Sequence, residues 1–305
     1  MTEREVPSYF AAFIAEYFGE RGAAWLVELP DLLATLARRW ELELLPPFAG
    51  LSFHYVAPVV RADGSPAVLK VGVPEEEART GIAFLRLCNG DGAVCLLEAD
   101  AEHCALLMER AFPGSPLTRL EDDDEATGIA AEVMRVLWRP VPATYSFITV
   151  GRRLRAFERV RQVYGGGAGP LSEGMLSRAE KLAIELLASA PYERVLHGDL
   201  HHDNIVAAQR APWLAIDPKG VVGDPGYETG ALMNNPYGRM ETWIAPGRQF
   251  ARRADILAER LRYPRERILA WTYTQAVLSA SWEVLAGTVR YGSWVARAEV
   301  VATLL

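Results

Sequence analysis

The stretch that most constrains this chain runs from Val195 to Val206 and reads V-L-H-G-D-L-H-H-D-N-I-V. A second apolar run, Trp213 to Ile216, follows it and ends at Asp217. Short apolar runs of this kind are typical of buried strands, so the polar side chains beside them are expected to gather at one place. Four residues separate Asp199 from Asn204, and Asp217 comes 18 positions after Asp199 (217 − 199 = 18).

These three side chains are of the types that phosphoryl transfer requires. The reaction needs a carboxylate facing the acceptor hydroxyl and oxygen ligands that hold Mg²⁺ on the phosphates. Asp199 suits the first role, whereas Asn204 and Asp217 suit the second, because Mg²⁺ prefers oxygen donors and commonly takes only one or two protein groups. The order H-x-D-x-x-x-x-N, followed by an Asp at a strand end, resembles the catalytic loop and metal-binding Asp of protein kinases.

The same stretch leaves a second kind of site open, a metal centre in a hydrolase. Imidazole and carboxylate groups together could hold Zn²⁺ or a pair of metal ions. The sequence has only two other histidines, His54 and His103, and neither lies in a recognisable ligand motif. The spacing therefore favours the phosphoryl-transfer interpretation over a metal site built from His197, Asp199, His201, His202 and Asp203.

Composition limits the class of protein and of partner. Hydrophobic residues make up 50% and charged residues 23% of the 305 positions, which is typical of a globular protein with a substantial core. The formal net charge is −7, from 32 Lys+Arg against 39 Asp+Glu. This balance argues against a nucleic-acid surface and is compatible with a cationic small-molecule ligand.

Nothing in the sequence points to a membrane or to export. The N-terminus has no basic segment followed by an apolar one, and no run of about eighteen apolar residues occurs. The three cysteines, Cys88, Cys95 and Cys104, are an odd set without C-x-x-C spacing, which favours free thiols in a reducing compartment. We therefore expect a cytoplasmic protein, and the sequence does not indicate its oligomeric state.

The first third of the chain predicts two helices followed by a small antiparallel sheet. The apolar spacing predicts helices over 7–18 and 30–40, the second with Pro30 and Asp31 as its start signal. Short β-type runs separated by turn residues follow at 41–45, 52–60, 66–73, 93–98 and 105–109. A Pro-Gly turn then leads into a helical region, so we expect an N-terminal domain over 1–110 and a helical domain over 111–305.

The predicted sheet contains candidate nucleotide-binding residues. Lys70 lies within A-V-L-K-V-G-V, where its ammonium could meet the α- and β-phosphates of ATP. Gly50 and Ser52 lie in a turn whose backbone N–H groups could approach phosphates. Three acidic residues, Glu75 to Glu77, precede the next predicted helix, which runs to about Leu87, and Glu77 is the preferred partner of Lys70. The alternative role for these acidic residues is to stabilise the helix N-terminus.

The rest of the chain is predicted to be mostly helical. Apolar spacing indicates helices over 126–138, 152–163, 172–190, 248–262, 265–286 and 289–305, with Ser172 as a candidate N-cap. The glycine-rich segment after Asp217 is expected to form a compact loop that holds Asp224 and Glu228. That loop could bring Asp224 against the Asp199 loop, or it could expose Asp224 and Glu228 to the acceptor.

Several of these motifs together resemble the aminoglycoside phosphotransferase superfamily, in its streptomycin 6-phosphotransferase and hydroxyurea phosphotransferase branch. The resemblance is carried by H-G-D-L-H-H-D-N-I and L-A-I-D-P-K-G-V-V-G-D-P-G-Y-E, and by N-G-D-G-A-V-C-L-L-E-A, L-L-M-E-R and P-A-V-L-K-V, over roughly residues 40 to 300. It implies an α+β, two-lobed protein-kinase-like fold with a small antiparallel β-sheet N-lobe, a mainly helical C-lobe, and ATP and Mg²⁺ as cofactors.

The resemblance also implies roles for individual residues. Asp199 is the expected catalytic base, Asn204 and Asp217 the Mg²⁺ ligands, and Lys70 the phosphate-binding lysine, and His197 is expected to pack the loop. Other expected nucleotide-binding residues are Glu77, Gly50, Ser52, Met108, Glu109 and Ala111, with Met108 beside the adenine.

The expected reaction is ATP-dependent O-phosphorylation of a small hydroxyl-bearing molecule, with streptomycin as the first candidate. Hydroxyurea or another small metabolite is the alternative acceptor, and a nucleotide-binding regulator without transfer activity is the alternative class. An aminoglycoside needs carboxylates for its cationic groups and could use an aromatic wall. The candidate acceptor-binding residues are Asp224, Glu228, Trp282 and Glu283, together with the neighbourhood of Asp203.

Overall fold

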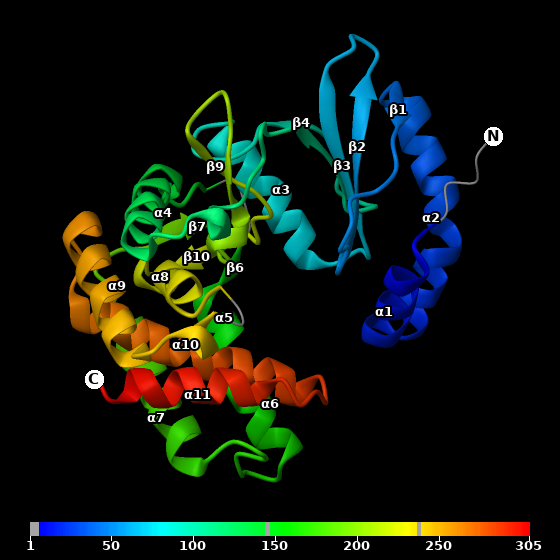
Figure 1. Cartoon of the computed structure of the whole chain (residues 1–305). Coiled ribbons are helices and arrows are strands. Elements are labelled where there is room, and N and C mark those ends of the chain that lie inside the picture. The colour runs from blue at the N-terminus through cyan, green and yellow to red at the C-terminus, as the bar shows by residue number, and fades with distance from the viewer. Residues whose placement is uncertain (1–5, 144–146, 237–238) are drawn as a thin grey trace. The chain divides into compact units, whose positions relative to one another are not determined.

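The computed structural model describes residues 6–143, 147–236 and 239–305. The chain divides into two compact units, and Figure 1 shows the elements of both. Unit 1 comprises Met1–Gly90 and Val94–Ala111, and unit 2 comprises Asp91–Ala93 and Phe112–Leu305. Unit 1 holds a five-stranded sheet with three helices among its described residues, and unit 2 is mainly helical.

The sheet of unit 1 is antiparallel throughout, as the sequence predicts. Its strand order is β1-β2-β3-β5-β4. The central strand β3 pairs Lys70 with Val56 on one side and with Leu106 on the other. The strands are β1 (Leu42–Leu44), β2 (His54–Arg61), β3 (Pro66–Gly72), β4 (Leu96–Asp100) and β5 (Ala105–Glu109).

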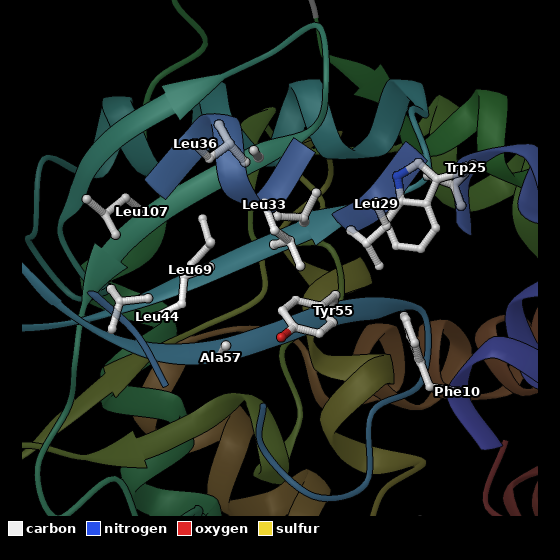
Figure 2. Close-up of a cluster of buried hydrophobic side chains, with 14 of the residues drawn as sticks. Phe10, Trp25, Leu29, Leu33, Leu36, Leu44, Tyr55, Ala57, Leu69 and Leu107 are labelled. Carbon is white, nitrogen blue, oxygen red and sulfur yellow. The ribbon is translucent and has the colours of Figure 1, made fainter. Parts of the chain in front are cut away.

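One face of this sheet is covered by the helices α1 (Ser8–Phe18) and α2 (Glu20–Arg39). Figure 2 shows Phe10 of α1, Leu33 of α2 and Tyr55 and Leu69 of the sheet in one buried cluster. Successive side chains of a strand point to opposite faces. Ala67, Leu69 and Val71 belong to this buried cluster, so Lys70 points to the other face, away from α1 and α2.

The predicted start of the second helix at Pro30 is wrong. Helix α2 begins at Glu20 and continues through Pro30, whose side chain lies on its exposed face. The helix extends this far because Trp25 and Leu29 continue the buried stripe of Leu33 and Leu36 at intervals of three and four residues. The next helix, α3 (Glu76–Cys88), also begins slightly earlier than expected, so that Glu76 and Glu77 lie in its first turn.

Helix α10 is the centre of unit 2, and it packs against helices α6, α7, α8, α9 and α11. Most of its residues are buried, Trp271 and Tyr273 among them. None of the helices in the described ranges combines the length and apolar composition needed to cross a membrane. The helices are α4 (Asp123–Leu137), α5 (Val150–Leu154), α6 (Ala156–Val163), α7 (Glu173–Ala188), α8 (Gly226–Met233), α9 (Pro246–Leu261), α10 (Arg265–Leu285) and α11 (Tyr291–Ala302), with short 3₁₀ turns at Leu117–Arg119, His202–Asn204 and Met240–Thr242.

Most of the helices predicted for unit 2 are confirmed, with small differences at their ends. The Ser172 hydroxyl caps α7 by accepting a hydrogen bond from the Met175 N–H at 3.2 Å. The single helix predicted over 152–163 is two helices, α5 and α6, which meet at Arg155. The apolar period does not reveal such a break, because the buried residues Leu154, Phe157 and Val160 keep a three-residue spacing across it.

Two small sheets of unit 2 hold the stretch from Val195 to Val206 and the residues around Asp217 in place. β10 (Val221–Gly223) pairs in parallel with β6 (Ile148–Thr149) and antiparallel with β7 (Arg194–Leu196). β8 (Ile205–Ala207) and β9 (Trp213–Ala215) form a hairpin. Both elements that follow Asp217, β10 and α8, were expected to be loop.

Glycine explains how α8 fits where a loop was expected. A Cβ at Gly226 would lie 2.5 Å from Cδ1 of Trp271, and one at Gly230 would lie 2.9 Å from Cδ of Gln275. Both contacts are with α10, so these glycines allow the two helices to approach closely. Glycines that suggest a loop in the sequence therefore serve helix packing here.

A buried ion pair provides a stability prediction for unit 2. Nε of Arg253, on α9, donates to Oδ2 of Asp123, on α4, at 2.7 Å, and the Arg253 side chain is fully buried. Replacing Arg253 with Met leaves the largely buried Asp123 carboxylate without its cation, so we expect about 3–5 kcal/mol loss in the free energy of unfolding. Denaturant unfolding monitored by circular dichroism measures this loss.

The adjacent pair supplies the control for this measurement. Arg252, also on α9, bonds Asp124 of α4 at 2.8 Å, but both side chains are exposed. We expect Arg252→Met to lower the free energy of unfolding far less than Arg253→Met does, because an exposed ion pair contributes little to stability. Equal losses in the two variants would contradict the structural role given to Arg253.

Candidate active site

Asp199, Asn204 and Asp217 are brought to one place by the strands β7, β8 and β9. Asp199 lies in the loop after β7, Asn204 ends the 3₁₀ turn before β8, and Asp217 follows β9. The Ile216 N–H donates to the Asn204 carbonyl at 2.9 Å, and Nδ2 of Asn204 donates to the Asp199 carbonyl at 2.9 Å. The hairpin therefore holds the metal-ligand candidates beside the loop that contains Asp199, residues 197–201, which we call the candidate catalytic loop.

Asn204 and Asp217 fit the donor set that Mg²⁺ prefers. Because the Asn204 amide nitrogen bonds the Asp199 carbonyl, its amide oxygen is the atom suited to a metal ion. Asp217 supplies a carboxylate, and its backbone φ of +57° is a left-handed conformation uncommon outside glycine. The side chains of Asp199 and Asp217 are 39% and 33% exposed, so a ligand can reach both.

His197 lies beneath the loop and is fully buried. Its Nδ1 accepts a hydrogen bond from the Asp199 N–H at 3.3 Å, so its Nε2 carries the proton and donates to the Ile216 carbonyl at 2.8 Å. Burial lowers the pKa of His197 to about 3, so the ring stays neutral near neutral pH. A neutral ring with both nitrogens engaged suits a packing role, whereas the Asp199 carboxylate stays accessible.

Glu228 holds the backbone of the loop from below. Its Oε2 accepts a hydrogen bond from the His197 N–H at 2.7 Å, and its Oε1 accepts one from the Gly198 N–H at 2.9 Å. The side chain is fully buried, and this burial raises the pKa of Glu228 to about 7 despite the opposing effect of the hydrogen bonds. The acceptor-binding role predicted for Glu228 is therefore wrong, because no substrate can reach a carboxylate enclosed in this way.

Asp224 is also misassigned as an acceptor-binding residue, for the same reason. Its residue surface is 1% exposed, and Oδ2 accepts hydrogen bonds from Nε of Arg267 and Nε1 of Trp271, both at 2.7 Å. Oδ1 accepts from the Gly226 N–H at 2.8 Å and from the Tyr263 hydroxyl. Asp224 thus ties the start of α8 to α10 and to the residues just before it.

Trp282 and Glu283, near the end of α10, are the more accessible pair of the predicted acceptor-binding residues. The guanidinium of Arg153 lies over the Trp282 ring, 5.4 Å from its centroid. Glu283 accepts hydrogen bonds from Nε of Arg290, at 3.1 Å, and from the Thr288 hydroxyl. Internal groups therefore already occupy one face of Trp282 and the carboxylate of Glu283.

The histidine-rich cluster does not form a metal centre of the kind considered for a hydrolase. His202 is buried, and among the described residues neither of its ring nitrogens has a hydrogen-bond partner. Asp203 is more than half exposed and accepts a hydrogen bond from the Thr118 hydroxyl at 2.9 Å. Within the described part of the chain, no group of three or more His, Cys, Asp and Glu side chains is arranged to hold a metal ion.

The nucleotide-binding candidates lie in unit 1. Lys70 is half-buried in the middle of β3, and Glu77 lies in the first turn of α3. The turn that contains Gly50 and Ser52 is fixed by the Tyr9 hydroxyl, which accepts hydrogen bonds at 3.1 Å from the N–H groups of Gly50 and Leu51.

The predicted adenine-binding residues lie at the end of β5 and just after it. Met108 is buried within β5, and Glu109 ends the strand, where its N–H donates to the Cys95 carbonyl at 2.9 Å. Ala111, two residues further on, is half-buried. The backbone of this segment therefore leaves the sheet at the position where the sequence predicts contacts with the base.

Two basic residues near the loop were not predicted as part of the site. Arg153 donates to the Gly198 carbonyl at 3.1 Å and to the Tyr227 hydroxyl at 3.2 Å. Lys219 lies beside the carboxylates of Asp199 and Asp217. The sequence signal for Lys219 is its place two residues after Asp217, whereas Arg153, 46 residues before Asp199 (199 − 153 = 46), has no local signal.

Comparison with known proteins gives consistent matches. The family model for aminoglycoside/hydroxyurea antibiotic resistance kinases matches residues 40–287. The chain is 37% identical to a streptomycin 6-kinase of Streptomyces griseus, over 97% of each chain. It is 33% identical to a hydroxyurea phosphotransferase of Kitasatospora aureofaciens, over 93% of this chain and 82% of the relative.

A solved structure supports the fold independently. An aminoglycoside phosphotransferase from Streptomyces rimosus, solved in complex with ADP and streptomycin, aligns with a TM-score of 0.55 at 21% identity. The alignment covers 81% of this chain and 97% of that protein. The protein-kinase-like fold expected from the sequence is confirmed by this likeness.

The buried Glu228 carboxylate gives a prediction for turnover and its pH dependence. The folded protein holds the Glu228 proton up to about pH 7, so the charged form with two accepting oxygens is present above that pH. Below it, one oxygen becomes a donor and faces an N–H group. We expect turnover of ATP to fall as the pH decreases through about 7, and Glu228→Gln to lower turnover by at least about tenfold, the effect of one lost hydrogen bond.

Steady-state rates between pH 6 and pH 8.5 measure both effects. The Gln side chain does not titrate, so the step near pH 7 should disappear in the variant. Glu185→Gln, at an exposed position on α7, is the control and should keep the wild-type profile. A wild-type rate and profile in Glu228→Gln would contradict this role.

Proposed function

The chain belongs to the aminoglycoside/hydroxyurea antibiotic resistance kinase family, and we propose that it transfers the γ-phosphoryl group of ATP to a hydroxyl group of streptomycin or a closely similar aminoglycoside. The observation that carries the proposal is the convergence of Asp199, Asn204 and Asp217 at one place in unit 2. Such a product would no longer be the antibiotic, so the reaction would give resistance by inactivation. We assign the reaction to the cytoplasm, where ATP is available.

Asp199 is the proposed catalytic base. Its carboxylate is accessible, whereas its backbone N–H and carbonyl are held by the His197 ring and the Asn204 amide. The acceptor oxygen forms a bond to the γ-phosphorus while the bond between that phosphorus and the bridging oxygen of ADP breaks. The hydroxyl proton passes to Asp199, and the electron pair of the broken bond leaves on ADP.

Asn204 and Asp217 are the proposed ligands of Mg²⁺. Bound there, the ion would neutralise charge on the phosphates of ATP. The amide oxygen of Asn204 and the carboxylate of Asp217 are hard donors, and their number matches the one or two protein ligands that Mg²⁺ commonly takes. The hairpin β8–β9 keeps the two side chains in register through the bond from Ile216 to Asn204.

Unit 1 supplies the proposed nucleotide-binding residues. Lys70 lies on the sheet face opposite α1 and α2, and we assign it to the α- and β-phosphates. Glu77 is the proposed partner that orients Lys70, and Met108 is the proposed neighbour of the adenine. The backbone of Gly50 and Ser52 is assigned to the phosphates, and that of Glu109 and Ala111 to the edge of the base.

The acceptor is proposed to be cationic, and Asp203, just after the candidate catalytic loop, is the exposed carboxylate best suited to meet it. Trp282 can contribute the part of its ring that is exposed, since Arg153 lies over one ring face. Hydroxyurea is the second candidate acceptor, favoured by the 33% identical phosphotransferase.

An acceptor panel tests the proposed function. We expect purified protein with ATP and Mg²⁺ to phosphorylate streptomycin, as measured by mass spectrometry of the product and by release of ADP. Asp199→Asn removes the base but keeps the shape of the side chain, and we expect it to lower turnover by at least about a hundredfold, the low end of a general-base contribution. Affinity for the nucleotide should change little.

A control variant and three alternative results complete this test. Asp255→Asn, an exposed position on α9, should leave turnover unchanged. Product with hydroxyurea but not with streptomycin would select the second candidate. Nucleotide binding without product from any acceptor would favour a regulator, and wild-type turnover in Asp199→Asn would contradict the assigned mechanism.

A further inference from the structure

The ammonium of Lys219 lies beside the carboxylates of Asp199 and Asp217, both of which are accessible. Its Nζ is 3.4 Å from Oδ2 of Asp217 and 4.0 Å from Oδ2 of Asp199. The Lys219 side chain is 19% exposed, so it is enclosed more than either carboxylate that it faces. A single positive charge therefore lies beside both the proposed base and a proposed metal ligand.

The backbone fixes the position of this lysine. The N–H groups of Lys219 and Gly220 both donate to the His197 carbonyl, at 2.8 and 3.1 Å. One residue further on, Val221 of β10 pairs with Leu196 of β7. These bonds attach the Lys219 segment to His197 of the loop and to β7, the strand that leads into the loop. The elements that place Asp199 therefore also place Lys219.

The charge is placed where phosphoryl transfer needs it. The proposed acceptor hydroxyl lies at Asp199 and the proposed metal-bound phosphates at Asp217, so the moving phosphoryl group passes between these two side chains. Its negative charge is spread over three oxygens during transfer. A fixed ammonium with three N–H donors can bind such oxygens, and its effect is strengthened where water is partly excluded.

We propose that Lys219 is a catalytic residue that binds the oxygens of the phosphoryl group while that group moves from ATP to the acceptor. This inference rests on the proposed function and adds a residue to it. Lys219 keeps its protons throughout, because the acceptor proton goes to Asp199 and the electron pair of the broken bond leaves on ADP. Between turnovers, the ammonium stays paired with the two carboxylates, as the structure shows.

Two substitutions separate this role from a purely structural one. Lys219→Met removes the charge and keeps most of the stem, whereas Lys219→Arg keeps the charge. We expect Lys219→Met to lower the rate of a single turnover by at least about a hundredfold, the effect of removing one group that stabilises transition-state charge. We expect the single-turnover rate of Lys219→Arg to be at least about tenfold higher than that of Lys219→Met.

Binding and stability are measured on the same variants. The affinity for a non-hydrolysable ATP analogue with Mg²⁺, determined by calorimetry, should stay within about threefold of wild type in Lys219→Met, since the interaction is strongest in the transition state. The melting temperature of Lys219→Met should also stay at the wild-type value. Lys181→Met, on the exposed face of α7, is the matched control and should match wild type in every measurement.

The outcomes distinguish this inference from the function on which it rests. A near-wild-type rate in Lys219→Met, or a loss confined to nucleotide affinity or melting temperature, would overturn the catalytic role while leaving the proposed function intact. Slow ATP hydrolysis, with water as acceptor, is measured in parallel. If wild type phosphorylates no aminoglycoside but hydrolyses ATP, and Lys219→Met loses that hydrolysis, the proposed acceptor fails and the role of Lys219 stands. A protein that neither binds nor hydrolyses ATP would overturn both.

Discussion

The carboxylate of Glu228 accepts hydrogen bonds from two backbone N–H groups of the candidate catalytic loop, those of His197 and Gly198. The geometry of the stretch from Val195 to Val206 depends on these two bonds. A buried carboxylate is costly unless it is hydrogen-bonded, and buried N–H groups are costly without an acceptor. Each therefore stabilises the other. Gly198 completes the arrangement with a φ of +83°, in a position where a Cβ would lie 2.5 Å from Cγ2 of Val221. The loop thus has one backbone path that satisfies both its polar groups and its packing.

The support continues from the loop into the helical core of unit 2. Glu228 lies in the first turn of α8, and Asp224, just before that helix, bonds Arg267 and Trp271 of α10. Arg153 adds a bond to the Gly198 carbonyl from α5. Residues that never touch a substrate therefore set where Asp199 and Lys219 lie, and changes in α8 are expected to act on turnover through the loop.

The sequence predicts the convergence of the polar side chains better than it predicts the buried groups that support them. The convergence of Asp199, Asn204 and Asp217 could be predicted because short strands and a hairpin hold these side chains at a fixed sequence spacing. For Asp224 and Glu228 the sequence left a bracing role and an acceptor-binding role open, because carboxylates are ordinarily expected at the surface and the burial of these two depends on α10, which lies later in the chain. The short α8 was missed for a related reason, since its glycines serve packing against α10. Pro30 was misjudged because a long amphipathic stripe outweighs a local start signal.

In the proposed mechanism, the phosphoryl group passes directly from ATP to the acceptor while Asp199 receives the hydroxyl proton. The most direct measurement uses ATP made chiral at the γ-phosphorus with oxygen isotopes, followed by analysis of the configuration at phosphorus in phosphorylated streptomycin. A single in-line displacement inverts that configuration, so we expect inversion. Retention would show that the group is transferred twice through a covalent intermediate on the protein, and it would contradict the role of Asp199 as a base.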